Sequence, residues 1–170
     1  MKKFEFTGET KTISLLFRTT TLHRIRAVAE FGLVKIGDLG GWIEKEENLS
    51  HEGKAWVCGN AVVRDNAVVR GDAEVRGNAV VRGNARISGK KDFLVIGPIG
   101  SRNDYTTFFK NESDGISVSC GCFFGTIEEF LRKVDRTHGG SVHAEAYIKA
   151  AELAKLRITD HEMESRYENY

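Results

Sequence analysis

Residues 53–89 alternate hydrophobic and polar positions with a period of six residues. Alanine occupies one phase of the repeat, and valine or isoleucine follows two residues later. The members are Ala55, Ala61, Ala67, Ala73, Ala79 and Ala85 in the first phase, and Val57, Val63, Val69, Val75, Val81 and Ile87 in the second. Glycine or aspartate opens each unit, and these residues tolerate the left-handed backbone of a tight corner. The repeat therefore predicts short strands, each with one inward face, joined by corners.

A typical unit, Val-Arg-Gly-Asn-Ala-Val, resembles the hexapeptide repeat of left-handed β-helix proteins. In those proteins three units form one triangular coil, with the valine and alanine side chains pointing inward. The resemblance implies that residues eighteen positions apart stack, such as Val57 on Val75 and Val63 on Val81. Six units supply only about two coils, so we expect flanking segments to cap the ends and copies of the chain to associate.

The segments on either side of the repeat follow other patterns. Residues 1–40 contain strand-like runs, such as 3–6, 13–17 and 22–28, that stop at a glycine-rich turn, which indicates an N-terminal β cap. We assign the repeat to residues 41–90, an α+β module to 91–158 and a polar, flexible tail to 159–170. The expected fold is thus mainly β. It consists of a short left-handed hexapeptide β-helix between the β cap and a module that contains a β-hairpin and two helices.

The α+β module contains local signals for each of its elements. Residues 105–109 and 116–120 predict a hairpin across a polar loop. Thr126 and Glu129 form a capping box before an apolar stripe of helical spacing, and Ser141 is placed to cap a second helix. The first of these helix N-termini is also a possible anion site, unless the capping box already satisfies its free amides.

The bulk composition excludes several classes of protein. The 170 residues include 25 Lys and Arg against 24 Asp and Glu, so nothing in the net charge of +1 favours nucleic acid or membranes. No apolar run approaches the about 20 residues of a membrane span, and the start of the chain lacks the pattern of a secretory signal. Three cysteines are too few for a disulfide framework. We expect a cytoplasmic protein.

Three stretches resemble a family of phage and prophage proteins of bacteria, whose functions are mostly unassigned. They are LHRIRA (22–27) with GDLGGWIE (37–44), the repeat itself, and IGPIGSRN (96–103) continuing to SCGCFFGT (119–126). The resemblance implies a protein that acts in the cytoplasm of an infected bacterial host. It implies no catalytic residue.

The loop at residues 97–103 is the main candidate for ligand binding. Its glycines let the backbone approach a ligand, and Arg102 offers a planar fork suited to phosphate or carboxylate. Two basic residues of a predicted strand could extend the surface. The full predicted set is Gly97, Gly100, Ser101, Arg102, Asn103, Thr106, Thr107, Arg24 and Arg26. The loop matches no nucleotide-binding fingerprint, and a tight turn with a solvated Arg102 is the structural alternative.

A zinc site is a weaker hypothesis. Cys120 and Cys122 share one face of an extended strand, and His138 and His143 could complete four ligands. Free cysteines are common in protein cores, however, and both histidines lie where one helix ends and the next begins. We therefore expect no metal and no cofactor.

The chain lacks a recognisable set of catalytic groups, which favours a binding protein. We expect a phage-encoded, non-catalytic protein that counters host defence by sequestering a nucleotide-derived or other anionic small molecule, or by blocking a host defence protein. A homo-oligomer is expected, and neither a membrane nor nucleic acid is an expected partner. Two alternatives stay open: a trimeric hexapeptide-repeat acyltransferase with His51 as its base, and a structural protein that assembles through the ends of its coils.

Overall fold

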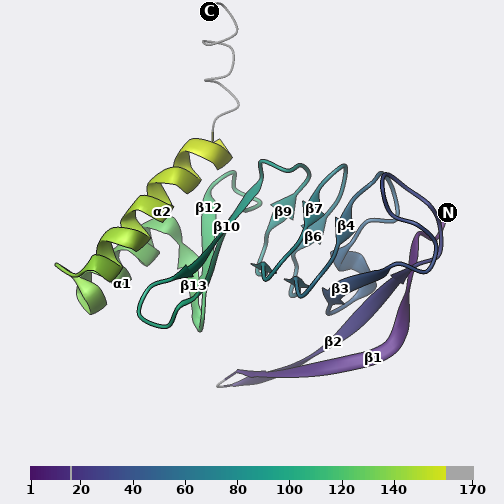
Figure 1. Cartoon of the computed structure of the whole chain (residues 1–170), viewed down its shortest axis with the longest axis horizontal. Coiled ribbons are helices and arrows are strands. Elements are labelled where there is room, and N and C mark those ends of the chain that lie inside the picture. The colour runs from purple at the N-terminus through teal and green to yellow at the C-terminus, as the bar shows by residue number, and fades with distance from the viewer. Residues whose placement is uncertain (16, 160–170) are drawn as a thin grey trace, which may run out of the picture. The chain divides into compact units, whose positions relative to one another are not determined.

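The computed structural model describes residues 1–15 and 17–159 (Figure 1). The chain divides into two compact units, which we call the N-terminal unit (Met1–Lys90) and the C-terminal unit (Lys91–Tyr170). The predicted tail lies outside the described residues, except for Thr159, which is the last residue of a helix.

A long antiparallel hairpin begins the N-terminal unit (Figure 1). Strand β1 (Phe4–Leu15) pairs with β2 (Arg18–Ala27), and β2 pairs in turn with β3 (Leu39–Ile43). A short 3-10 helix, η1 (Glu46–Asn48), follows. The sequence predicted separate short strands for residues 3–6 and 13–17. The structure instead has one strand of 12 residues, with a register shift between Phe6 and Thr10.

The repeat forms six strands of two residues each. They are β4 (Trp56–Val57), β5 (Val62–Val63), β6 (Val68–Val69), β7 (Glu74–Val75), β8 (Val80–Val81) and β9 (Arg86–Ile87). Their parallel pairs join Val57 to Val75, Val63 to Val81 and Val69 to Ile87. The inward valines and alanines are fully buried. The predicted stacking of residues eighteen apart is confirmed.

The predicted left-handed β-helix is wrong. Strands β4–β7 and β6–β9 are separate two-stranded sheets, and none of the sheets in residues 1–15 and 17–159 closes or curls into a helix. The third pair, β5–β8, extends the hairpin and β3 into a five-stranded sheet of order β1-β2-β3-β5-β8. With only six units, each two-residue strand has few hydrogen-bonding partners. β3 pairs with β5 on one side and with the antiparallel hairpin on the other, so these strands extend an open sheet. The described part of the chain is mainly β, with 42% strand and two α-helices.

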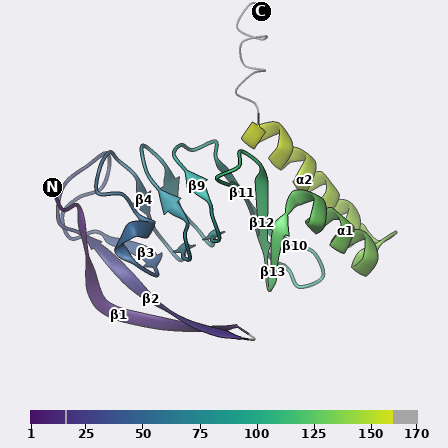
Figure 2. The same cartoon turned by 180° about the vertical axis from the view of Figure 1, so that it is seen from behind.

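The C-terminal unit is a four-stranded antiparallel sheet with two helices. The strands are β10 (Phe93–Ile99), β11 (Asp104–Lys110), β12 (Ile116–Cys120) and β13 (Phe123–Thr126), and the helices are α1 (Ile127–His138) and α2 (Val142–Thr159). The strands pair in chain order, which confirms the predicted hairpin of β11 and β12. The sequence did not predict β13. Both helices lie side by side against this sheet (Figure 2).

Local capping explains where the helices begin. The Glu129 N–H donates to Thr126 Oγ1 at 3.2 Å, and the Thr126 N–H donates to Glu129 Oε2 at 2.8 Å. The N–H of Ala144 donates to Ser141 Oγ at 3.3 Å. Both predicted caps are confirmed. The reciprocal bonds at Thr126 already use amides that an anion would need at this N-terminus.

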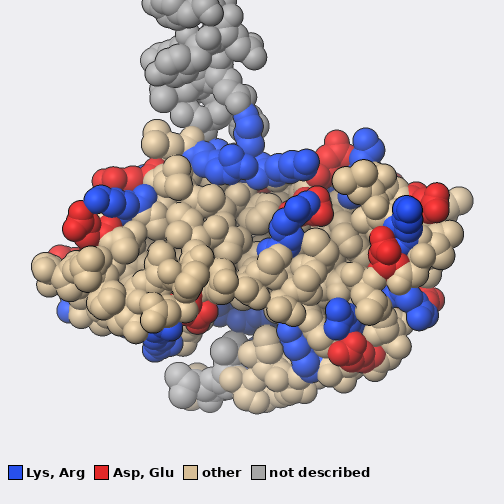
Figure 3. Space-filling model, viewed as in Figure 1, with Lys and Arg blue, Asp and Glu red and all other residues tan. Residues whose placement is uncertain are grey.

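Basic and acidic side chains lie side by side at several places on the face shown in Figure 3. Ion pairs in the N-terminal unit join Arg26 to Glu5 and Arg18 to Glu44. A search of the described helices finds none with the length and apolar character that crossing a membrane requires.

Candidate functional site

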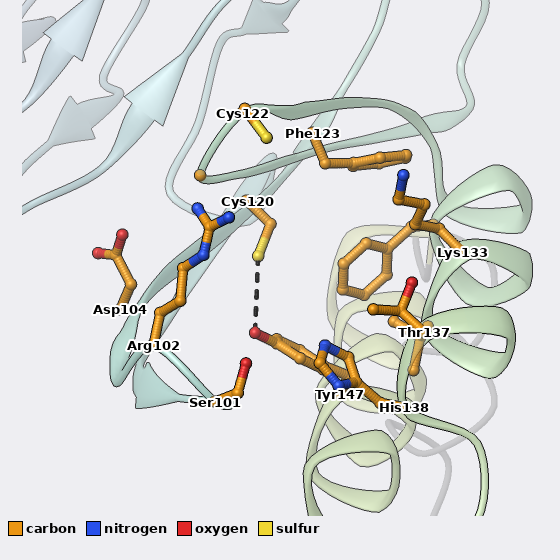
Figure 4. A pocket seen from close by; sticks show the side chains of 13 residues that line it. Ser101, Arg102, Asp104, Cys120, Cys122, Phe123, Lys133, Thr137, His138 and Tyr147 are labelled. Carbon is orange, nitrogen blue, oxygen red and sulfur yellow. Dashed lines mark hydrogen bonds between the residues drawn. The ribbon is translucent and has the colours of Figure 1, made fainter.

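A pocket of about 140 Å³ lies within the C-terminal unit (Figure 4). The loop after β10, the turn between β12 and β13, and both helices supply its walls. The lining residues are Ser101, Arg102, Asp104, Cys120, Gly121, Cys122, Phe123, Phe130, Lys133, Val134, Thr137, His138 and Tyr147. The inner wall is mostly apolar, and the charged side chains come from its opposite sides.

Aromatic rings form the inner wall. The ring of Phe130 meets Tyr147 edge to face at 5.5 Å, and the ring of Phe123 lies 5.6 Å from Phe130. These separations are in the range preferred by aromatic pairs. Phe130 and Tyr147 are buried, so the wall is held by the core of the unit. It therefore presents a fixed apolar surface to a ligand.

Tyr147 places the only hydroxyl on this aromatic wall. Its Oη lies 3.9 Å from Cys120 Sγ, the contact drawn in Figure 4. Burial and the neighbouring Cys120 raise the pKa of Tyr147 to about 12. The phenol therefore keeps its proton at neutral pH and can donate a hydrogen bond to a ligand.

Two cations face the pocket from different elements. Arg102 comes from the loop after β10, and Lys133 comes from α1 (Figure 4). The Arg102 guanidinium lies against the turn between β12 and β13, because a Cβ added at Gly121 would be 3.0 Å from its Nη1. Among the described residues neither cation forms an ion pair. Both charges are thus available to an anion.

One acidic residue also lines the pocket. Asp104 Oδ1 accepts a hydrogen bond from the N–H of Tyr105 at 2.7 Å. In Figure 4 its carboxylate points away from Tyr147, beyond the Arg102 side chain. The pocket therefore carries two cations and one carboxylate that is directed outward, a balance that favours an anionic ligand.

Only part of the predicted ligand-binding set reaches this pocket. Ser101 and Arg102 line it. Gly100 lies behind Tyr147, and Asn103 closes the turn by donating its N–H to the Gly100 carbonyl at 3.2 Å. Gly97 packs against Tyr105. The loop thus contributes one hydroxyl and one cation, and its other residues shape the backbone.

The predicted threonines and N-terminal arginines lie elsewhere. Thr106 and Thr107 are buried, and Thr106 Oγ1 donates to Cys120 Sγ at 3.3 Å. In the N-terminal unit, Arg24 pairs with Glu9 at 3.6 Å and Arg26 pairs with Glu5 at 2.5 Å. These side chains are held by local partners.

The proposed zinc ligands do not converge. Cys120 contacts Tyr147 and Thr106, whereas Cys122 is exposed. His138 faces the rings of Tyr147 and His143 at about 6 Å. Over residues 1–15 and 17–159, no three His, Cys, Asp or Glu side chains are grouped as metal ligands.

His51, the base of the acyltransferase alternative, is engaged by its neighbours. Its Nδ1 accepts the N–H of Lys3 at 3.1 Å, and its Nε2 lies 2.9 Å from Glu46 Oε1. The ring stacks on Phe4 at 4.3 Å. A histidine whose two nitrogens are both used in this way serves the structure, and a general base needs one of them free for substrate.

Most of the pocket was missed by reasoning from the sequence. Lys133, Thr137 and Tyr147 lie on helices, where spacing alone does not show which turn faces a cavity. The sequence indicated Cys120, Cys122 and His138 only as candidate zinc ligands, and the helix N-terminus at Thr126 as a candidate anion site. A scan of protein-family models finds none that matches the chain, and a search of curated proteins finds no match either.

Proposed function

We propose that this chain is a non-catalytic binding protein whose C-terminal unit captures a small anionic molecule. The observation that carries the proposal is a pair of cations, Arg102 and Lys133, at a pocket with an aromatic wall; within the described part of the chain neither forms an ion pair with a carboxylate. A guanidinium and an ammonium are the groups that bind phosphate or carboxylate, the first as a fork and the second as a point charge.

Capture of an anion fits a role in countering host defence. The resemblance to phage and prophage proteins supports an origin in a phage and an action in the cytoplasm of the infected cell. A protein that withdraws a nucleotide-derived signal needs affinity for a phosphate and a surface for a ring, and it needs no catalytic group. The pocket offers both of these features.

Thermal unfolding in the presence of anions tests the proposal. We expect inorganic phosphate and a panel of nucleotides to include ligands that raise the melting temperature, because a ligand of the native state stabilises it by about 2.7 kcal/mol at a hundred times its Kd. Arg102→Ala and Lys133→Ala should reduce this shift. Arg132→Ala is the matched control, since Arg132 is exposed on α1 and does not line the pocket.

Two results would contradict the proposal. The first is a melting temperature that stays unchanged with phosphate and with every nucleotide. The second is a shift of equal size in the Arg102→Ala, Lys133→Ala and Arg132→Ala proteins, which would place binding elsewhere. A chain that acts by blocking a host protein would give the first result.

A further inference from the structure

The size of the pocket limits its ligand more narrowly than its charge does. An apolar cavity of about 150 Å³ accommodates one benzene ring. The pocket here has about 140 Å³, with Phe130 and Val134 buried in its wall. The pocket is open to solvent on one side, so one six-membered planar ring fills the space against the wall and the rest of a ligand extends out of it.

The polar groups stand at defined places around that space. Arg102 and Lys133 approach from opposite sides, while Ser101 and Thr137 add hydroxyls (Figure 4). An anionic group attached to the ring can meet the cations while the ring stays against the aromatic wall. A phosphate suits this arrangement because its several oxygens can accept from both cations and from a hydroxyl.

We infer that the pocket binds an organic monophosphate that carries one six-membered aromatic ring, with the ring against Phe123 and Phe130 and the phosphate between Arg102 and Lys133. A cellular member of this class is a pyrimidine nucleoside monophosphate, in which a ribose links the ring to the phosphate. This inference rests on the proposed function and narrows it, since a cyclic dinucleotide would leave one base outside the pocket.

Calorimetric titration with inorganic phosphate, phenyl phosphate, UMP and a cyclic dinucleotide tests the inference. We expect phenyl phosphate and UMP to bind about ten- to a hundredfold more tightly than inorganic phosphate, because burial of the ring adds to the binding of the anion. The cyclic dinucleotide should bind less tightly than UMP.

The variants Phe123→Leu and Phe124→Leu distinguish the contribution of the ring to the affinity from that of the phosphate. Phe123 lines the pocket, whereas its neighbour Phe124 does not and stacks on Phe109. We expect Phe123→Leu to reduce the preference for phenyl phosphate over inorganic phosphate at least threefold, with the affinity for inorganic phosphate retained. Phe124→Leu should keep the full preference.

Alkylation of Cys122 supplies a second readout on the same proteins. This thiol is exposed and lines the pocket, so a bound ligand should slow its reaction with iodoacetamide. We expect UMP to slow the reaction at least fivefold in the unmodified chain and in Phe124→Leu. Protection that is equal with inorganic phosphate and UMP at matched occupancy, or absent with both, would contradict a ring seated in the pocket.

The outcomes distinguish the inference from the function on which it rests. If inorganic phosphate binds and phenyl phosphate binds no more tightly, the ring site is wrong and anion capture stands. If no anion binds and none protects Cys122, both are wrong. Tighter binding of the cyclic dinucleotide than of UMP would also overturn the inference.

Discussion

Gly100 lies directly against the hydroxyl group of Tyr147. A Cβ added at Gly100 would stand 1.8 Å from Tyr147 Oη, a separation that no packed structure allows. Gly100 also has a φ of +75°, in the left-handed region. The loop that carries Arg102 and the helix that carries Tyr147 therefore meet at a residue that has to be glycine for two independent reasons.

Replacement of this glycine tests the contact. We expect Gly100→Ala to lower the free energy of unfolding by about 2–4 kcal/mol, from overpacking and backbone strain together. Gly140 is the matched control, because it has the same φ of +75° and nothing within 4 Å of an added Cβ. Gly140→Ala should cost about 1 kcal/mol, from strain alone. Equal losses in urea unfolding would show that the contact does not constrain residue 100.

The raised pKa of Tyr147 predicts a loss of stability in alkaline solution. An unfolded tyrosine loses its proton near pH 10, whereas Tyr147 in the folded chain has a pKa of about 12. Between these values the folded state holds the extra proton, so the free energy of unfolding falls as pH rises.

Urea unfolding of the unmodified chain and of Tyr147→Phe between pH 9 and about 11 measures this effect, since the phenylalanine variant cannot titrate. We expect the difference in stability between the two proteins to decline above pH 10. A constant difference over this range would show that the pKa of Tyr147 is not raised.

Lys3 predicts the opposite trend for the N-terminal unit. Its ammonium is buried and donates to the Ala55 carbonyl at 2.7 Å, and burial lowers its pKa from 10.5 to about 8. Between these values the unfolded chain holds the proton and the folded chain does not, so stability increases as pH rises from 8 to 10.5.

The variant Lys3→Met removes this titration, and Lys2→Met is its control because the Lys2 ammonium is exposed. We expect the stability of the unmodified chain to rise relative to Lys3→Met between pH 8 and 10, as measured by urea unfolding. Relative to Lys2→Met the stability should show no such trend. A difference in stability between the unmodified chain and Lys3→Met that stays constant over this pH range would contradict the lowered pKa of Lys3.

Asp65 occupies a corner of the repeat where most other units have glycine. Its φ is +60°, its Oδ2 accepts the N–H of Gly83 at 3.1 Å, and its Oδ1 pairs with Arg18 at 3.1 Å. The carboxylate thus joins two levels of the repeat and the hairpin.

We expect Asp65→Ala to lower the free energy of unfolding by about 2–3 kcal/mol, because it loses the hydrogen bond and leaves a side chain at positive φ. Asp65→Gly retains the backbone freedom and should cost about 1 kcal/mol. Urea unfolding measures both values. A larger loss for glycine than for alanine would contradict the role assigned to the backbone.

Several elements were predictable because their causes are local. The capping box of Thr126 and Glu129 lies within one helical turn, and the hairpin of β11 and β12 follows from two apolar runs around a polar loop. The pairing of Val63 with Val81 follows from the strict period of the repeat. The prediction of a closed β-helix was wrong, because the sequence does not show which sheet each short strand joins.

Most of the candidate site was likewise hidden. The sequence indicates the loop with Ser101 and Arg102, because its glycines and its basic residue are close together along the chain. It does not show that Lys133 and Tyr147, from two helices, face the same space. The sequence also does not show why residue 100 is glycine, because the close contact comes from the phenol of Tyr147, which is far along the chain.

The amino-acid sequence by itself determined the period of the repeat, its buried valines and alanines, and the start of both helices. These features depend on neighbours within a few residues or on a fixed spacing. The tertiary structure alone decided the union of β5–β8 with the hairpin, the ion pairs of Arg24 and Arg26, and the pocket between the sheet and helices. Each of these depends on contacts between distant segments, which form only when burial of the two cores brings the segments together.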